Sequence, residues 1–327
     1  MTRVLIIGGG GMVGQKLAAR LVAEGMPGHP ELDITLFDVA FPPNGVAGVK
    51  CKTGNLSSTG VAKDLVSEHP DIVFHLAAIV SGESETNFTK GWDVNMMSMW
   101  HLLEAFRNAY EASGGTYLPK VVFTSSIAVF GGPFPDKIDD EFLSAPQTSY
   151  GAQKAISELM LSDFSRKGFV DGLSLRFPTI CVRPGKANLA ASSFFSGIIR
   201  EPLSGKEAIL PVKPSVRHWH ASPRAAAEFL IHAAGLDTML LKGRRALNLP
   251  GLSCTVEEQI EALRRIAGQD AVDLIKVQHD PAIIKIVDGW PRNFNPERAI
   301  SLGFKAETTF DEIIRTYITE DLPNAAP

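Results

Sequence analysis

The chain has 327 residues, 45% of them hydrophobic, which is enough to form one large domain with a full core and a smaller lobe. The 32 Lys and Arg residues are outnumbered by 36 Asp and Glu residues, so the formal net charge of -4 excludes a strongly cationic surface for nucleic acid or acidic membranes. Three widely separated cysteines give neither a disulfide framework nor zinc-ligand spacing, which favours a reducing, cytoplasmic location.

Short apolar runs rich in β-branched residues alternate with stretches of helical periodicity through the first 180 residues. This alternation predicts an α/β fold, a doubly wound parallel sheet of the Rossmann type with helices on both faces. The first run is too short to be a signal peptide or to cross a membrane. The predicted strands are 4–7, 34–37, 72–76, 121–124 and 173–177, and the predicted helices are 15–24, 61–68, 94–109 and 152–165.

Beyond residue 177 prolines become frequent and the regular alternation stops. Ser222 before Pro223 predicts the start of a helix over 224–234. Capping-box spacing at Thr255 and again at Thr309 predicts two more helices. We therefore expect a large Rossmann domain over residues 1–180 and a smaller α/β lobe over 181–327, partly interleaved with the first.

Glycines follow the first predicted strand and open the first predicted helix. They fit two frames, Gly8-x-x-Gly11-x-x-Gly14 and Gly9-x-Gly11-x-x-Gly14. Glycine lets the backbone approach a pyrophosphate closely, and the helix then offers free N–H groups to the phosphates. Four consecutive glycines also suit a flexible turn, but this loop is followed by an acidic residue at the end of the second strand.

That residue is Asp38, 24 positions after Gly14. A carboxylate there accepts hydrogen bonds from ribose hydroxyls and repels a 2′-phosphate, so NAD is favoured over NADP. The alternative is a solvated residue at the end of the strand.

Tyr150 and Lys154 lie one helical turn apart, and Ser126 ends an upstream strand. A tyrosine with a pKa of about 10 is a poor base at neutral pH, but an ammonium about 4 Å away stabilises the phenolate by about 4 kcal/mol. The serine would orient the reacting oxygen. These three residues predict hydride transfer at a carbon that bears a hydroxyl, whereas a packed tyrosine and a solvated lysine are the alternative.

In their order and context, these motifs resemble the extended short-chain dehydrogenases, the NAD-dependent epimerase/dehydratase group, over nearly the whole chain. Residues 125–131 look like the family's fifth-strand motif, and Tyr150-Gly-Ala-Gln-Lys154 looks like its catalytic pair. The resemblance implies Ser126, Tyr150 and Lys154 as catalytic residues and NAD as the cofactor. It implies a cofactor site formed by Gly8, Gly11, Met12, Val13, Gly14, Asp38, Asn55, Leu56, Leu76, Ala77, Ala78, Asn95, Tyr150, Lys154 and Pro178.

Two departures from the family pattern narrow the expected reaction. Asn55 stands where an Asp usually contacts the adenine, which should weaken that contact. Ile127 and Ala128 follow Ser126 where sugar dehydratases carry an acidic pair, so dehydration is disfavoured. The stretch 217–224 is similar to that of members that oxidise a four-carbon sugar acid at its second carbon, which implies a small carboxylate substrate and a 2-keto product.

A carboxylate substrate requires a cationic partner, for which Arg183 and Arg217 rank before Lys186. Each has the alternative of an ordinary surface salt bridge. Ser81 and Ser84, in a predicted polar loop over 81–86, are candidates for substrate hydroxyls together with Ser126 and Tyr150. A plain solvated loop is the alternative.

His218 and His220 suggest a metal, but the intervening Trp219 and the lack of nearby acidic residues favour a packed strand end, so no metal is predicted. Residues 96–100 are expected to be an apolar helix face, in the core or at a subunit interface. The family resemblance implies a homodimer formed through this helix and the Tyr150 helix. Besides a sugar-acid dehydrogenase, an NAD-dependent sugar epimerase and a non-catalytic dinucleotide sensor remain alternatives.

Overall fold

The computed structural model describes residues 1–185 and 191–322, and the chain divides into two compact units. The first unit contains Met1–Val129, Pro146–Arg176 and Ala227–Leu247. The second contains Phe130–Ala145, Phe177–Ala226 and Asn248–Pro327, as far as these ranges are described. The chain therefore passes between the units several times. The cofactor-binding and substrate-binding roles of the two parts stay predictions.

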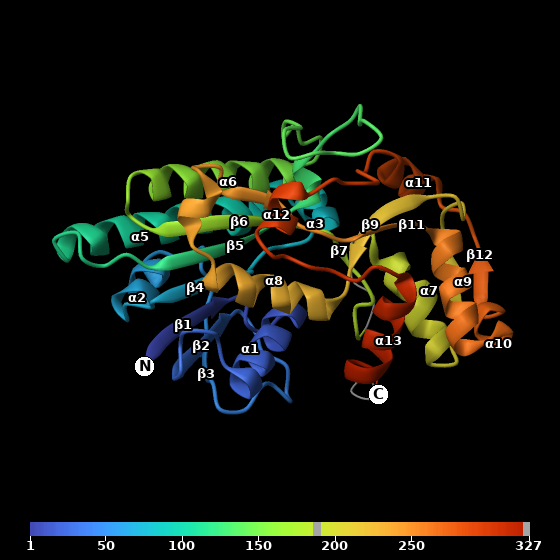
Figure 1. The fold of residues 1–327 in the computed structure, drawn as a ribbon, viewed down its shortest axis with the longest axis horizontal. Helices are drawn as coiled ribbons and strands as arrows, with labels where there is room; N and C mark the ends of the chain where they lie inside the picture. Colours follow the sequence, from blue (N-terminus) through green and yellow to red (C-terminus); the bar gives the residue numbers. More distant parts are fainter. Residues whose placement is uncertain (186–190, 323–327) are drawn as a thin grey trace. The chain divides into compact units, whose positions relative to one another are not determined.

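The first unit contains a seven-stranded sheet with the order β10-β6-β5-β4-β1-β2-β3 (Figure 1). The pairs β1–β2, β1–β4, β2–β3 and β4–β5 are parallel, which confirms the predicted doubly wound fold. Val4 to Ile7 of β1 are all buried, as a central strand covered on both faces requires. The strands are β1 (Thr2–Ile7), β2 (Leu32–Asp38), β3 (Lys50–Thr53), β4 (Ile72–His75), β5 (Lys120–Ser126), β6 (Asp171–Phe177) and β10 (Ala246–Asn248).

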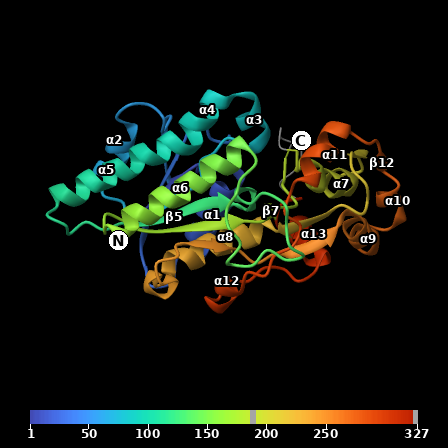
Figure 2. The same cartoon turned by 90° about the horizontal axis from the view of Figure 1, so that it is seen from above.

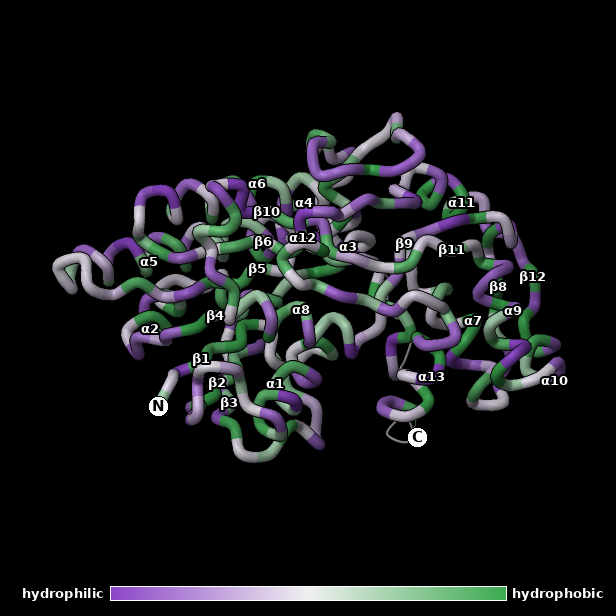
Figure 3. The backbone as a smooth tube through the Cα atoms, in the orientation of Figure 1, coloured by the Kyte–Doolittle hydropathy of each residue, from purple (hydrophilic) through white to green (hydrophobic). Residues whose placement is uncertain are grey.

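Helices cover this sheet on both faces, with α2, α5 and α6 on one and α1 and α8 on the other (Figures 1 and 2). A cluster that includes Leu5, Val73, Phe106, Phe123 and Leu161 fills the space between β1, β4, β5 and the first group of helices. Figure 3 shows the hydrophobic stretches along these central strands. The helices of this part are α1 (Met12–Glu24), α2 (Val61–Ser67), α3 (Ser81–Thr86), α4 (Phe88–Trp92), the π-helix η1 (Asp93–Met97), α5 (Ser98–Ala112), the short η2 (Ile127–Val129), α6 (Ser149–Arg166), α8 (Pro223–Gly235) and η3 (Thr238–Leu241).

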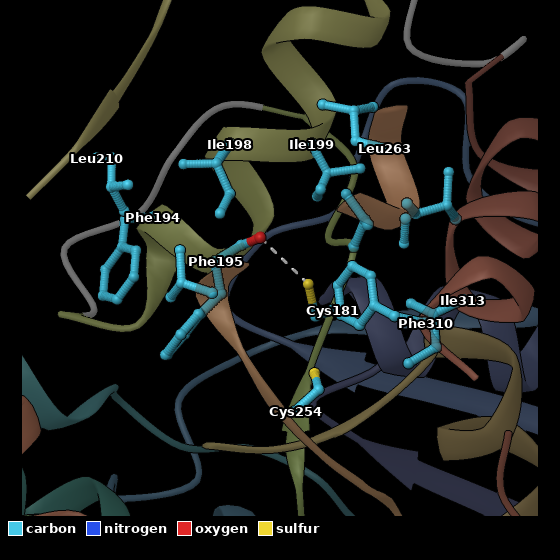
Figure 4. Packing of buried hydrophobic residues seen from close by; sticks show 14 of the residues in the cluster. Cys181, Phe194, Phe195, Ile198, Ile199, Leu210, Cys254, Leu263, Phe310 and Ile313 are labelled. Atoms are coloured by element: carbon cyan, nitrogen blue, oxygen red, sulfur yellow. Dashed lines mark hydrogen bonds between the residues drawn. The ribbon is translucent and has the colours of Figure 1, made fainter. Parts of the chain in front are cut away.

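The second unit has a three-stranded sheet, β11-β9-β7, and a two-stranded sheet, β12-β8. Phe195, Phe310, Cys181 and Cys254 lie in its buried core (Figure 4). The thiol of Cys181 donates to the carbonyl of Phe195 at 3.4 Å. The elements are β7 (Thr179–Ile180), α7 (Ser193–Leu203), β8 (Ala208–Leu210), β9 (Arg217–Ala221), β11 (Leu252–Thr255), α9 (Val256–Ala267), α10 (Gln269–Val272), β12 (Ile275–Val277), α11 (Pro281–Asp288), α12 (Glu297–Ser301) and α13 (Phe310–Glu320).

The predicted helix starts are confirmed. The hydroxyl of Ser222 accepts the N–H of Ala225 at 3.0 Å at the start of α8. Complete capping boxes start α9 at Thr255 and α13 at Thr309. One local prediction was wrong: residues 81–86 form the helix α3, not a loop. No helix within residues 1–185 and 191–322 is both long and apolar enough to span a bilayer.

Candidate active site

The glycine loop between β1 and α1 packs so tightly that most of its positions exclude a side chain. A Cβ on Gly8, whose φ is +88°, would lie 2.5 Å from the nitrogen of Ala77. A Cβ on Gly14 would lie 2.4 Å from the carbonyl oxygen of Gly8. These two glycines are therefore required by the protein's own packing. The close approach at Gly8 places the segment after β4, which contains Leu76, Ala77 and Ala78, directly against the glycine loop.

Gly11 differs, because a Cβ there would meet only the carbonyl oxygen of Gly8, at 3.5 Å. It is exposed and forms the N-cap of α1 without a side-chain cap, and the first turn of α1 contains no acidic residue. That turn contains Met12, Val13 and Gly14, whose N–H groups have no carbonyl partner within the helix. A helix end with room at Gly11 and no acidic side chain in its first turn fits the pyrophosphate of NAD.

Asp38 ends β2 beside this loop. One carboxylate oxygen accepts the N–H of Gly10 at 2.9 Å and the other accepts the N–H of Val39 at 2.7 Å. Each carboxylate oxygen has a further lone pair for a ribose hydroxyl. After β3, Asn55 is exposed and its side-chain oxygen accepts the N–H of Ser57 at 3.0 Å, while Leu56 is buried.

The start of α6 reaches the end of β5 through a second close contact. A Cβ on Gly151 would lie 2.1 Å from the carbonyl oxygen of Ala128, so only glycine permits this approach. Thr148 caps the helix by accepting the N–H of Gly151 at 3.1 Å. Ser126 ends β5 and its hydroxyl accepts the N–H of Ala128 at 3.1 Å. The fold thus brings Tyr150, the second residue of α6, to the same end of the sheet as Ser126.

Lys154 is almost completely buried, with 2% of its surface exposed. Its ammonium donates to the carbonyl oxygen of Thr124 at 2.7 Å and lies 4.6 Å from the ring centre of Phe123 and 5.7 Å from that of Tyr150. Burial lowers the pKa of Lys154 to about 7, although the negative charge of Glu158 raises it. The sequence predicted a cation beside Tyr150 but not its burial, and the alternative of a solvated lysine does not fit this burial.

The side-chain amide of Asn95, in the π-helix η1, forms hydrogen bonds with other groups of the protein. It accepts the N–H of Ile79 at 2.9 Å and donates to the side-chain oxygens of Gln153 at 2.8 Å and Ser84 at 3.1 Å. Its placement supports a structural role that links the segment after β4 to α6. Ser84 has no exposed surface and accepts this bond, so its placement does not support a substrate contact. Ser81 is half-buried at the start of α3.

The remaining predicted substrate and cofactor residues belong to the second unit. Arg217 forms an ion pair with Glu258 at 3.3 Å and donates to the carbonyl oxygen of Ser253 at 3.0 Å. Arg183 donates through Nε to the carbonyl oxygen of Ile180 at 3.0 Å. Pro178 lies between β6 and β7, and Lys186 lies outside the described residues.

His218 and His220 are packed in β9, as predicted. Nδ1 of His218 lies 3.1 Å from the carbonyl oxygen of Pro291 and therefore donates, and Nε2 accepts the hydroxyl of Thr179 at 2.7 Å. The ring of His218 stacks on Phe195 at 5.2 Å, and burial lowers its pKa to about 4. Among the described residues, no three His, Cys, Asp or Glu side chains are placed to bind a metal ion.

His75, at the end of β4, was not identified from the sequence. It has no exposed surface, and neither ring nitrogen has a hydrogen-bond partner in the described structure. Burial, followed by the positive charge of Lys154, lowers the pKa of His75 to about 3. The signal available in the sequence was a histidine within an otherwise apolar central strand.

Comparison with known proteins gives consistent results. The model of the NAD dependent epimerase/dehydratase family matches residues 4–222. The chain is 47% identical to a D-erythronate dehydrogenase of Cupriavidus necator over 97% of this chain and 98% of that protein. It is 40% identical to a D-erythronate dehydrogenase of Haemophilus influenzae over 98% of this chain and 100% of that protein.

Solved structures show the same architecture. A crystal structure described as a nucleoside-diphosphate-sugar epimerase from Agrobacterium tumefaciens is 52% identical and has a TM-score of 0.94, over 98% of this chain and 95% of that one. An L-threonine dehydrogenase from Cupriavidus necator is 23% identical with a TM-score of 0.81, over 99% of this chain and 100% of that one, and shares the fold.

The glycine loop predicts different effects for two substitutions. Gly11→Ala should leave the unfolding temperature nearly unchanged and weaken NAD binding about tenfold or more, because the added methyl group enters the space left for the phosphates. Gly14→Ala should destabilise the fold, because its methyl group meets the Gly8 carbonyl. Calorimetric NAD titration and thermal unfolding of both variants separate the two effects. Unchanged NAD affinity in Gly11→Ala would contradict this assignment.

The buried histidines predict a loss of stability in acid. An unfolded histidine with a pKa of about 6.5 binds a proton that folded His75 excludes, so stability is lost as pH falls below about 6.5, at about 1.4 kcal/mol per pH unit for each such histidine. His75→Leu removes one of these groups without losing a hydrogen bond of the ring. Its unfolding free energy, measured by urea titration between pH 7 and pH 5, should therefore decline less steeply than that of the wild type; parallel curves would refute the assignment.

Proposed function

Since this chain belongs to the NAD dependent epimerase/dehydratase family, we propose that it is an NAD-dependent dehydrogenase that oxidises the C2 hydroxyl of a small sugar acid such as D-erythronate to the 2-keto acid. NAD is the cofactor of the family. The observation that carries the proposal is the convergence of Ser126, Tyr150 and buried Lys154 at one end of the sheet, which also carries the glycine loop.

The chemistry requires a base for the hydroxyl proton while a hydride leaves C2. Bound NAD supplies the hydride acceptor. Tyr150 takes the proton from the substrate hydroxyl, and the positive charge of Lys154 lowers the free energy of the resulting phenolate. Ser126 donates a hydrogen bond to the substrate oxygen and orients it. The C–H and O–H bonds break and a C=O bond forms, and the proton passes from Tyr150 to solvent.

Arg183 and Arg217 are the proposed carboxylate partners, since a guanidinium binds a carboxylate through two parallel hydrogen bonds. To do so, Arg217 must share its guanidinium with Glu258 or release it. Ser81 is the proposed partner of a substrate hydroxyl.

Epimerisation is the second candidate function, because the structure with a TM-score of 0.94 is described as an epimerase. An epimerase returns the hydride to its substrate, so free NADH does not accumulate, whereas a dehydrogenase releases NADH. A dinucleotide sensor has no use for the buried lysine beside Tyr150.

The proposed reaction predicts NADH formation from NAD and D-erythronate, measured by absorbance. Aldonic acids of other lengths should react more slowly, and erythritol, which lacks the carboxylate, should not react. Tyr150→Phe should bind NAD normally and lose about 100-fold or more in kcat, because the general base is removed. Equal rates with erythritol would exclude the arginine role, and full activity of Tyr150→Phe would exclude the catalytic assignment.

We also propose a homodimer formed through α5 and α6, where large apolar side chains face outward. Trp100 on α5 is 41% exposed and Leu159 on α6 is 72% exposed. Leu159→Arg should convert the dimer to a monomer in sedimentation analysis, because a charge buried at an apolar interface is not compensated. Leu143→Arg, at an exposed leucine outside these helices, is the control. A wild-type monomer, or equal dissociation in both variants, would contradict the proposal.

A further inference from the structure

Glu158 is a buried carboxylate on α6 that the reaction itself does not use. It follows Tyr150 and Lys154 at intervals of four residues and is therefore on nearly the same face of the helix. Only 6% of its surface is exposed. Its carboxylate accepts the hydroxyl of Ser125 at 2.5 Å and a fork from Arg176, with Nε at 3.0 Å and Nη2 at 2.8 Å.

These hydrogen bonds join α6, which carries Tyr150 and Lys154, to β5, which ends at Ser126, and to the neighbouring strand β6. Ser125 immediately precedes Ser126 in β5, and Arg176 lies in β6. Successive side chains of a strand point to opposite faces, so the Ser125 hydroxyl that reaches α6 also fixes the peptide from which Ser126 projects. Glu158 thus fixes the end of β5 at a set position along the Tyr150 helix.

Helix docking alone does not explain this ion pair. Leu161 and Phe164 of α6 already pack into the apolar cluster beneath the helix. A buried ion pair costs desolvation free energy, so apolar residues of similar size often stabilise a fold as well or better. What apolar residues do not provide is a directional bond that selects one register between helix and strand.

We propose that Glu158 is a positioning residue, which holds Ser125 and Arg176 so that the hydroxyls of Ser126 and Tyr150 face the same substrate oxygen. This inference rests on the proposed dehydrogenase function. The negative charge of Glu158 also raises the pKa of Lys154, which burial lowers, and so favours the charged lysine.

Ser125→Ala tests the proposal with little damage to the ion pair, since Arg176 keeps its fork on Glu158. The control is Ser165→Ala. Ser165 is likewise a buried serine, but it lies on α6, far from the Tyr150 end of that helix. Its hydroxyl donates to the carbonyl of Leu161 at 2.6 Å and accepts the N–H of Gly172 at 3.0 Å. Ser125→Ala should lower kcat about tenfold or more, with KM for NAD and for the sugar acid within about twofold of the wild type. Ser165→Ala should keep kcat within about twofold.

Glu158→Gln extends the test, because it removes the negative charge on which the Arg176 fork lies. This variant should lose at least as much kcat as Ser125→Ala, measured at a temperature where unfolding scans show it folded. If it does not fold, Ser125→Ala decides the question. A wild-type kcat in Ser125→Ala, or equal losses in Ser125→Ala and Ser165→Ala, would overturn the proposal.

Crystal structures of the wild type and Ser125→Ala provide a readout independent of the substrate. The distance between Ser126 Oγ and Tyr150 Oη should change by about 0.5 Å or more in the variant, which is the tolerance of a productive catalytic geometry. Superimposable sites would refute the positioning role. If the wild type forms no NADH from any sugar acid, the proposed function fails, and this distance still tests the positioning role.

Discussion

The candidate site depends on keeping an ammonium group inside the protein. Lys154 has 2% of its surface exposed, and burial shifts its pKa from that of a surface lysine to about 7. Three features compensate for the lost hydration: the carbonyl of Thr124, the ring of Phe123 and the negative charge of Glu158. Because its pKa lies near neutral pH, the protonation of Lys154 changes strongly when another charge is placed beside it. In the proposed reaction, the oxidised nicotinamide and the phenolate of Tyr150 carry charges of opposite sign, so both would change the protonation of this lysine.

The fold, and the elements that carry the candidate site residues, followed from patterns that local physics determines. Buried parallel strands require continuous apolar runs, and such runs predicted β1, β4 and β5. The hydroxyl caps at Ser222, Thr255 and Thr309 predicted the starts of three helices. The strand β3 and the helix α3 were missed. The first is mostly exposed and polar, and the second has six residues without apolar periodicity, so neither gives a hydrophobic signal.

Burial depth was the property that spacing did not predict. A four-residue interval places Tyr150 and Lys154 on one face, but it does not say that the lysine is buried or that Glu158, one further turn along, is paired behind it. Arg176 was the available signal, because an arginine in the mostly buried strand β6 requires a polar or charged partner nearby. Similarly, Ser84 looked like a loop residue open to ligands until the structure showed its bond to Asn95.

The two hydrogen bonds that Asp38 accepts from Gly10 and Val39 have a consequence for protein engineering. In the proposed cofactor site, a preference for a dinucleotide with a 2′-phosphate requires removal of the carboxylate at the end of the second strand, because that carboxylate repels the phosphate. Here that replacement also removes the acceptor that holds the N–H of Gly10. A redesigned protein would therefore need a second polar side chain to hold the glycine loop in shape, as well as a new cation.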